Sequence, residues 1–325
     1  MLSSGSFARR FNTKYQQYYS RNLRRETPNT PPPTYLLITT SSKIYSMRIP
    51  ASFNYAGIDL QQRENEVIYS ESGHLNNWIT DAFYVKSEDL IYVNVYNSTS
   101  YSSNIFTLKY NRYGNKWEKK VLYKDQSYCL GITYNEAKKE LYWTAAKSVM
   151  AGSTGTNQTY KVIFELNRTK KLLYLKYDHV KNVIYVSTLN YVYECSVDRE
   201  IPQNIYYTEK CRVISRNLVS ARGLYIDDVN RQLYVIDHKN RKINRISLKK
   251  DMVKKNVNSH IDNQVNDQKF KYFGLRNDKR DSLKPVTTLV SQNTLPNLGD
   301  IFYMCIYNKS NEDILIWSEF SGRFK

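Results

Sequence analysis

The stretch that decides the fold is Arg222–Asp237, which reads RGLYIDDVNRQLYVID. A short apolar run precedes the polar turn 227–231, and a second apolar run centred on Tyr234 follows it. Runs of β-branched and aromatic residues bounded by Asp and Asn are typical of antiparallel strands joined by turns. A third run, Lys242–Leu248, follows another polar turn. The stretch therefore predicts a small antiparallel sheet.

The same order of runs and turns recurs along the chain. We call the central tyrosines of the clearest copies the anchor tyrosines; they are spaced 50, 43 and 49 residues apart and are Tyr92, Tyr142, Tyr185 and Tyr234. A looser copy spans 302–319. A propeller blade of four short strands takes roughly 40 to 50 residues. Each small twisted sheet has two apolar faces, so it buries both only between neighbours around an axis. The repeat therefore predicts an all-β propeller.

The anchor segments resemble a known motif. Tyr142-Trp143-Thr144 matches the first three residues of the YWTD motif, and Tyr234 and Asp237 keep its first and last. On these residues, the region 35–250 resembles the YWTD (LDL-receptor class B) repeat family. The resemblance implies a six-bladed β-propeller with four-stranded antiparallel blades, its ring closed by N-terminal strands that complete the last blade. In the family the motif Asp ties adjacent blades together. Ala145 and Thr188 replace it in two copies here, which puts those ties in doubt.

The C-terminal region carries a second resemblance. The segments 269–275, 289–293 and 314–320 are similar, in that order, to the closing blades of the yellow/major royal jelly family. That family is also a six-bladed propeller, and the resemblance implies a secreted binder of a small ligand, such as an amine, in the central channel. The two resemblances agree on the fold and differ on the biology.

The charge and proline pattern predicts two regions. Residues 1–34 are expected to form a basic, flexible tail that ends in the run 27–33, with four prolines, and residues 35–325 the propeller domain. A basic loop insertion is expected at about 249–268, because 239–284 holds 14 Lys and Arg against five Asp. Its candidate anion-binding residues are Lys249, Lys250, Lys254 and Lys255. A disordered, solvated insertion is the alternative.

The net charge of +18 favours anionic partners such as glycans. Nucleic acid is not favoured, because the basic segment has few aromatic residues on which bases could stack. No apolar run approaches the length of a membrane helix, so no membrane span is expected.

The cysteines and sequons bear on the compartment. Cys195 and Cys211 fall on strands expected to be adjacent, so they form either a disulfide or two buried thiols. Four sequons are candidate glycosylation sites: Asn97, Asn157, Asn167 and Asn308. No signal peptide is visible, and the N-terminus resembles a mitochondrial presequence or an incomplete start. From the disulfide and sequons we expect a secreted or extracellular glycoprotein.

The common catalytic signatures are absent from the sequence, including G-x-S-x-G, H-E-x-x-H and the P-loop. We therefore expect a non-catalytic binding propeller that recognises a protein or an anionic ligand through loops on one face. A small-ligand binder of the yellow type and a propeller hydrolase or lactonase with a channel metal are the alternatives. No cofactor is predicted, and a divalent cation in the channel stays open.

Overall fold

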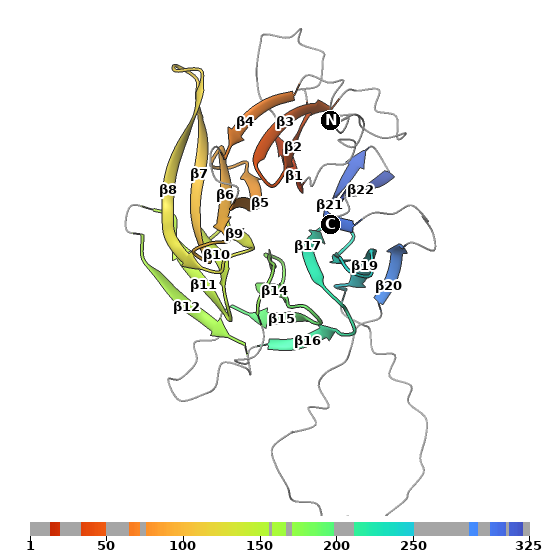
Figure 1. Cartoon of the computed structure of the whole chain (residues 1–325). Helices are drawn as coiled ribbons and strands as arrows, with labels where there is room; N and C mark the ends of the chain where they lie inside the picture. Colours follow the sequence, from red (N-terminus) through yellow and green to blue (C-terminus); the bar gives the residue numbers. More distant parts are fainter. Residues whose placement is uncertain are drawn as a thin grey trace, which may run out of the picture.

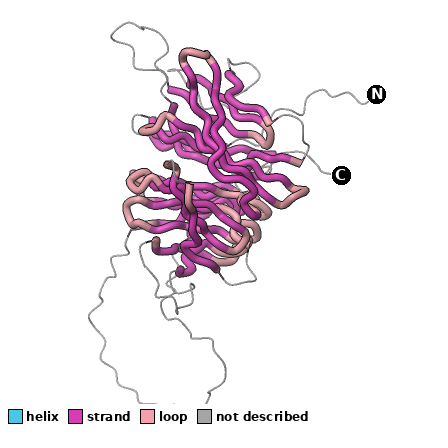
Figure 2. Tube along the Cα trace, turned by 90° about the vertical axis from the view of Figure 1, so that its left-hand side faces the viewer, coloured by secondary structure: helices cyan, strands magenta, loops and turns pink. Residues whose placement is uncertain are grey.

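The computed structural model of the 325-residue chain describes residues 14–19, 34–49, 65–71, 76–155, 158–166, 171–197, 211–249, 286–291, 300–309 and 312–320. These residues form strands, turns and loops without a helix, which confirms the all-β prediction. It follows that the described part of the chain offers no helix long and apolar enough to cross a membrane. Figure 2 shows this composition from the side.

The described strands form five four-stranded antiparallel sheets and one two-stranded sheet, which we number in chain order. Sheet 1 consists of β1 (Lys14–Tyr19), β2 (Thr34–Thr39), β3 (Lys43–Ile49) and β4 (Asn65–Ser70). Sheet 2 consists of β5 (Asn77–Val85), β6 (Leu90–Asn97), β7 (Ser102–Asn111) and β8 (Lys116–Ser127). Sheet 3 consists of β9 (Ile132–Asn135), β10 (Glu140–Ala145), β11 (Ser148–Ser153) and β12 (Tyr160–Glu165). Sheet 4 consists of β13 (Leu175–Asp178), β14 (Val183–Ser187), β15 (Val192–Ser196) and β16 (Cys211–Ser215). Sheet 5 consists of β17 (Ala221–Asp227), β18 (Gln232–Asp237), β19 (Lys242–Ser247) and β20 (Val286–Val290). Sheet 6 consists of β21 (Asp300–Lys309) and β22 (Glu312–Phe320).

The sheets follow one another around a common centre, and the first strand of each lies nearest to it (Figure 1). We call these first strands the inner strands. Neighbouring inner strands are in contact: β9 with β13, β13 with β17, and β1 with β5. Small antiparallel sheets packed radially in this way make a β-propeller arrangement.

Three details differ from the sequence-based expectation. A strand, β1, lies within the expected tail 1–34, because its Tyr-rich sequence KYQQYY favours a strand despite the surrounding positive charge. The strands β2, β3 and β4 pair with β1 and not with β21 and β22, so the described N-terminal strands form a sheet of their own. The last sheet has two strands among the described residues where four-stranded blades were expected.

The described apolar core lies between neighbouring sheets, with one cluster for each of the four interfaces from sheet 1 to sheet 5. On β10, Leu141 and Trp143 belong to the cluster shared with sheet 2, whereas Tyr142 belongs to the cluster shared with sheet 4. All three side chains are fully buried. Successive side chains of a strand point to opposite faces, so one strand supplies two interfaces at once. Tyr92 and Tyr185 likewise face the sheet that follows their own.

In sheets 3, 4 and 5, a polar side chain holds the segment of chain that enters the sheet. In sheet 5, the carboxylate of Asp237 accepts hydrogen bonds from the backbone N–H groups of Val219 and Ser220, both at 3.1 Å. In sheet 3, the hydroxyl of Thr144 accepts from Leu130 and Gly131, at 3.1 and 3.3 Å.

In sheet 4, a hydroxyl group also holds the segment of chain that enters the sheet. The hydroxyl of Ser187 accepts a hydrogen bond from the N–H of Tyr174 at 3.2 Å. Ala145 and Thr188 do replace the motif Asp, but the hydroxyl residue immediately before each holds the entering chain. Each of these bonds joins a strand to the segment that enters its own sheet.

Candidate functional site

Three of the anchor tyrosines direct their hydroxyls at carboxylates. Tyr92 donates to Glu88 at 2.6 Å, Tyr142 to Glu140 at 2.9 Å and Tyr185 to Glu194 at 3.1 Å. Burial, followed by the adjacent carboxylate, raises the pKa of the Tyr92 hydroxyl above its ordinary value. These rings are core residues whose polar ends are satisfied, so we assign them a structural role.

A row of stacked rings starts at the inner strand of sheet 2. The ring of Phe83 stacks on Tyr92 with centroids 5.4 Å apart, and Tyr92 stacks on Tyr134 of β9 at 5.1 Å. Glu88 accepts hydrogen bonds from both tyrosines, so the two rings are fixed relative to each other. Burial, with the Glu88 bond as the next cause, raises the pKa of Tyr134 to about 12.

Lys176 lies at the Phe83 end of this row. It occupies the inner strand β13, directly opposite Tyr185, and its Nζ is 5.7 Å from the centroid of the Phe83 ring. The side chain is partly exposed, yet burial of its amino group lowers its pKa to about 8. We call Lys176 and the rings of Phe83, Tyr92 and Tyr134 the inner-strand site. No local sequence pattern indicates this site, because its residues come from three different sheets.

A charged network joins sheets 4 and 5. The carboxylate of Asp178, which is fully buried, lies 2.5 Å from Nη2 of Arg231. Arg231 also contacts Asp228 at 3.2 Å. The charges therefore compensate one another across the interface, and the network stabilises the packing of the two sheets.

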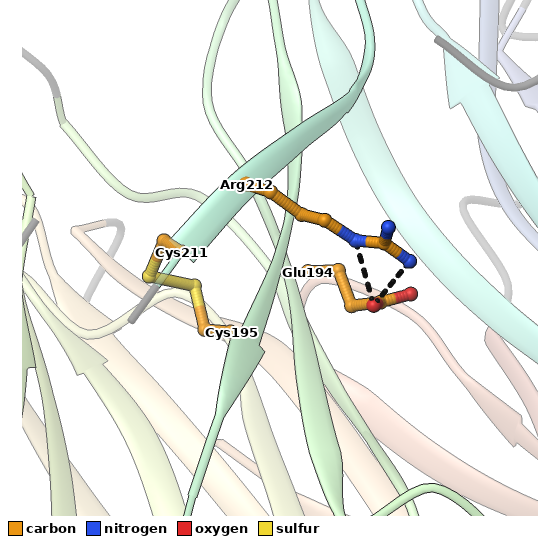
Figure 3. Close-up of a disulfide and its surroundings, with 4 residues drawn as sticks. All are labelled: Glu194, Cys195, Cys211 and Arg212. Atoms are coloured by element: carbon orange, nitrogen blue, oxygen red, sulfur yellow. Dashed lines mark hydrogen bonds and ion pairs between the residues drawn. A yellow bond between two sulfur atoms is a disulfide. The ribbon is translucent and has the colours of Figure 1, made fainter. Parts of the chain in front are cut away.

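The two candidate disulfide cysteines meet on adjacent strands of sheet 4. Cys195 on β15 is directly opposite Cys211 on β16, with Cα atoms 4.1 Å and sulfur atoms 2.13 Å apart (Figure 3). The next pair in the register is Glu194 and Arg212, whose Nη2 lies 2.7 Å from the carboxylate. The structure thus joins as a disulfide the pair for which the sequence left two states open.

The longest hairpin of the structure carries an exposed basic face. Strands β7 and β8 have 10 and 12 residues, whereas the outer strands β12, β16 and β20 have 6, 5 and 5. The hairpin extends past the other sheets at the upper left of Figure 1. Its exposed cations are Lys109, Arg112, Lys116, Lys119, Lys120 and Lys124, against the acids Glu118 and Asp125. This cluster was not predicted, because the largest local excess of positive charge in the sequence lies at 239–284.

The pairing register divides the hairpin into two faces. Lys109 is opposite Glu118, and Lys116 and Lys120 lie two residues to either side of Glu118, so all four share one face. We call this the lysine face. The opposite face packs on sheet 1, where Nε1 of Trp117 donates to Glu66 at 3.4 Å.

Lys119 completes the contact with sheet 1. Its Nζ lies 4.0 Å from the centroid of the Phe106 ring and donates to the hydroxyl of Tyr69 at 3.2 Å. At the hairpin turn, Tyr113 is fully exposed.

The remaining sequence-predicted residues are dispersed or outside the described part. Lys249 is exposed just after β19, and Lys250, Lys254 and Lys255 lie outside the described residues, so the predicted anion-binding group stays a prediction. Asn157 and Asn167 also lie outside them, and Asn308 belongs to strand β21. The side-chain nitrogen of Asn97 donates to Asn77 at 2.7 Å, and this nitrogen would keep one N–H after glycan attachment. Within the described ranges, His, Cys, Asp and Glu form no group of three or more that could hold a metal ion.

No protein-family model and no curated protein sequence matches the chain. Among solved structures, a luciferin-regenerating enzyme is similar over 68% of this chain and 69% of its own, with 10% identity and a TM-score of 0.48. A chain from a nidogen/laminin complex is similar over 66% and 89%, with 13% identity and a TM-score of 0.47. Regucalcin, a calcium-binding protein from Agrobacterium tumefaciens, is similar over 67% and 66%, with 9% identity and a TM-score of 0.46. Likeness at this level carries no functional argument, so the fold rests on the sheets themselves.

Proposed function

We propose that this protein is a binding propeller of the YWTD type, with six blades, that holds an anionic partner on the lysine face of the β7–β8 hairpin. The six-bladed ring is supported by contacts at both ends of the chain: β21 packs against β17 on one side and against β1 on the other. β1 in turn contacts β5, so the terminal inner strands lie between sheets 5 and 2.

The single observation that carries the binding role is the charge of the hairpin. Its exposed residues include six cations and two acids, on a ribbon that leaves the compact part of the fold. Outer strands often carry lysine to prevent edge-to-edge pairing. The greater length and larger number of cations favour a surface that contacts another molecule.

The lysine face fits an extended sulfated glycan. At about 3.3 Å per residue, Lys116 and Lys120 are about 13 Å apart along β8, and Lys109 approaches the middle of that line from β7. The row holds three cations around one acid, Glu118, and its extended shape suits a flexible chain of sulfate groups better than a compact ligand. Base stacking is not offered there, because Trp117 and Tyr110 lie on the opposite face and pack on each other at 5.3 Å.

The test is retention on immobilised heparin, a sulfated glycan, followed by elution with salt. We expect the double variant Lys116→Glu/Lys120→Glu to elute at markedly lower salt, because two attractive contacts become repulsive. The control is Lys86→Glu/Lys161→Glu, which changes the net charge equally at two exposed positions outside the hairpin. Equal losses in both variants would show retention by net charge alone and would reject the hairpin as the site.

The secreted, glycosylated state is the second part of the proposal. Its support is the Cys195–Cys211 pair, because disulfides between strands persist in oxidising compartments. The protein isolated from its natural source should lose mass on enzymatic removal of N-linked glycans. An unchanged mass after this treatment rejects the glycoprotein assignment.

A further inference from the structure

The lysine face of the β7–β8 hairpin continues into the gap between sheets 2 and 3. Lys120 is opposite Thr107, and the next pair on the same face, two residues further along β7, is Ile105 and Tyr123. Two residues of a strand span about 7 Å, so Tyr123 lies close to the last cation of the face. The opposite face of the hairpin packs on sheet 1, whereas Ile105 and Tyr123 belong to the apolar cluster shared with sheet 3. The lysine face is therefore turned towards sheet 3.

Tyr160, on the outer strand β12 of sheet 3, lies against the end of this face. Its ring makes a T-shaped contact with Tyr123, with centroids 5.8 Å apart, and lies at the same distance from the ring of Trp143. Tyr123 and Trp143 are buried, whereas Tyr160 is 53% exposed. Two aromatic contacts therefore hold the ring on one side, and its accessible part lies at the outer rim between sheets 2 and 3.

Gly152 makes room for this arrangement. It is directly opposite Tyr160 in the β11–β12 pair, and a Cβ atom there would collide with the hydroxyl end of Tyr123. The phenol of Tyr123 thus reaches across to sheet 3, where its hydroxyl donates to the backbone oxygen of Ser153 at 2.5 Å. Because Tyr123 is tied to sheet 3 in this way, the position of Tyr160 relative to the lysine face is fixed.

The surface next to the lysine face is apolar as well as aromatic. Val162 follows Tyr160 by two residues, so it lies on the same side of β12, and it is 45% exposed. A partner that carries only charge would contact the lysines alone. A sulfated glycan presents sulfate groups together with the apolar C–H faces of its sugar rings, and an exposed tyrosine has an apolar ring with a polar tip that suits such a face.

We propose that Tyr160 stacks on a sugar ring of the sulfated glycan whose sulfate groups contact the lysine face. The proposal rests on the glycan-binding function proposed above and extends it from the charge of the ligand to the sugar itself. It separates a sulfated glycan from a polyanion without sugar rings, such as polyphosphate. Both molecules contact the lysines, and only the glycan uses Tyr160.

The test compares the dissociation constants of heparin and of inorganic polyphosphate at one fixed salt concentration, because salt screens both interactions. We expect Tyr160→Leu to weaken heparin binding at least about fivefold, which corresponds to about 1 kcal/mol, since it removes the stacked ring. The same variant should bind polyphosphate as the wild-type protein does, which also shows that it is folded. Tyr160→Phe keeps the ring and should retain the heparin affinity.

Tyr113→Leu is the matched control, because it removes a fully exposed tyrosine at the turn of the same hairpin. It should leave the affinities for heparin and polyphosphate unchanged. Unchanged heparin binding by Tyr160→Leu overturns the inference. An equal loss of heparin and polyphosphate affinity in that variant, or a similar loss of heparin affinity in Tyr113→Leu, overturns it as well.

The variant Lys116→Glu/Lys120→Glu distinguishes failure of this inference from failure of the proposed function. It should weaken the binding of both polyanions, because it reverses charges that both contact. A loss in this variant without a loss in Tyr160→Leu keeps the hairpin as the binding site and rejects the sugar contact alone. Heparin binding that neither variant weakens rejects both proposals.

Discussion

Removing the Cys195–Cys211 disulfide should lower the stability of the protein measurably. The two residues are 16 positions apart in sequence, and the bond restricts the unfolded chain over that loop. The loop-entropy relation gives about 3 kcal/mol for a closure of this length. We expect Cys211→Ser to lose this amount, because Cys211 is partly exposed and serine itself is tolerated there.

The assay is urea-induced unfolding followed by intrinsic fluorescence, with and without a reductant. Reductant should shift the midpoint of the wild-type protein to lower urea and leave the midpoint of Cys211→Ser unchanged. The free, buried Cys129 is present in both proteins, so it cancels in this comparison. Peptide mapping without reduction should yield a linked pair two hydrogens lighter than the separate peptides.

Two results would refute the reasoning. A wild-type midpoint that reductant does not change would mean that the bond does not restrict the unfolded chain. A digest in which both cysteine peptides appear as free thiols would mean that the pair is not bonded in solution, and the proposed oxidising compartment would lose its support.

Three further perturbations test the packing between sheets. Arg231→Met should cost about 3 to 5 kcal/mol in urea unfolding, because it leaves the buried carboxylate of Asp178 uncompensated; a cost below 1 kcal/mol would contradict the buried ion pair. Thr144→Val should cost about 1 to 3 kcal/mol, since two backbone N–H groups lose their acceptor, and Thr144→Ser should restore most of it. Stability should fall as pH rises from 10 to 12, because an unfolded tyrosine ionises near pH 10 while Tyr134 in the folded state keeps its proton to about pH 12. Urea midpoints that stay constant over that pH range would reject the third prediction.

Gly152 shows how closely neighbouring sheets approach each other, which no local sequence rule revealed. A Cβ atom at this position would lie 2.8 Å from Cη2 of Trp143 and would also meet the hydroxyl end of Tyr123, which belongs to sheet 2. The sequence shows only a glycine in a strand. The contact with Tyr123 depends on how β8 and β11 are placed relative to each other, which sequence periodicity does not encode.

The repeating unit can be predicted from the amino-acid sequence alone. The alternation of apolar and polar residues around Tyr92, Tyr142, Tyr185 and Tyr234 specified strands with two buried faces, because successive side chains of a strand point in opposite directions. The same pattern located Cys195 and Cys211 on neighbouring strands. The prediction was wrong at β1. The positive charge and the following prolines led us to expect a flexible tail there, despite the short Tyr-rich run.

Which residues meet across sheets depends on the tertiary packing of the sheets. Lys176 meets Phe83 although 92 positions of chain lie between them, and the lysine face forms because the pairing register of β7 and β8 places Lys109 beside Lys116 and Lys120. Thr144 and Ser187 hold the entering chain in place of the missing motif Asp. Each of these contacts is set by the packing of sheets around the centre. A strand's own sequence fixes its two faces, whereas the residue that each face meets is fixed by the sheet packed against it.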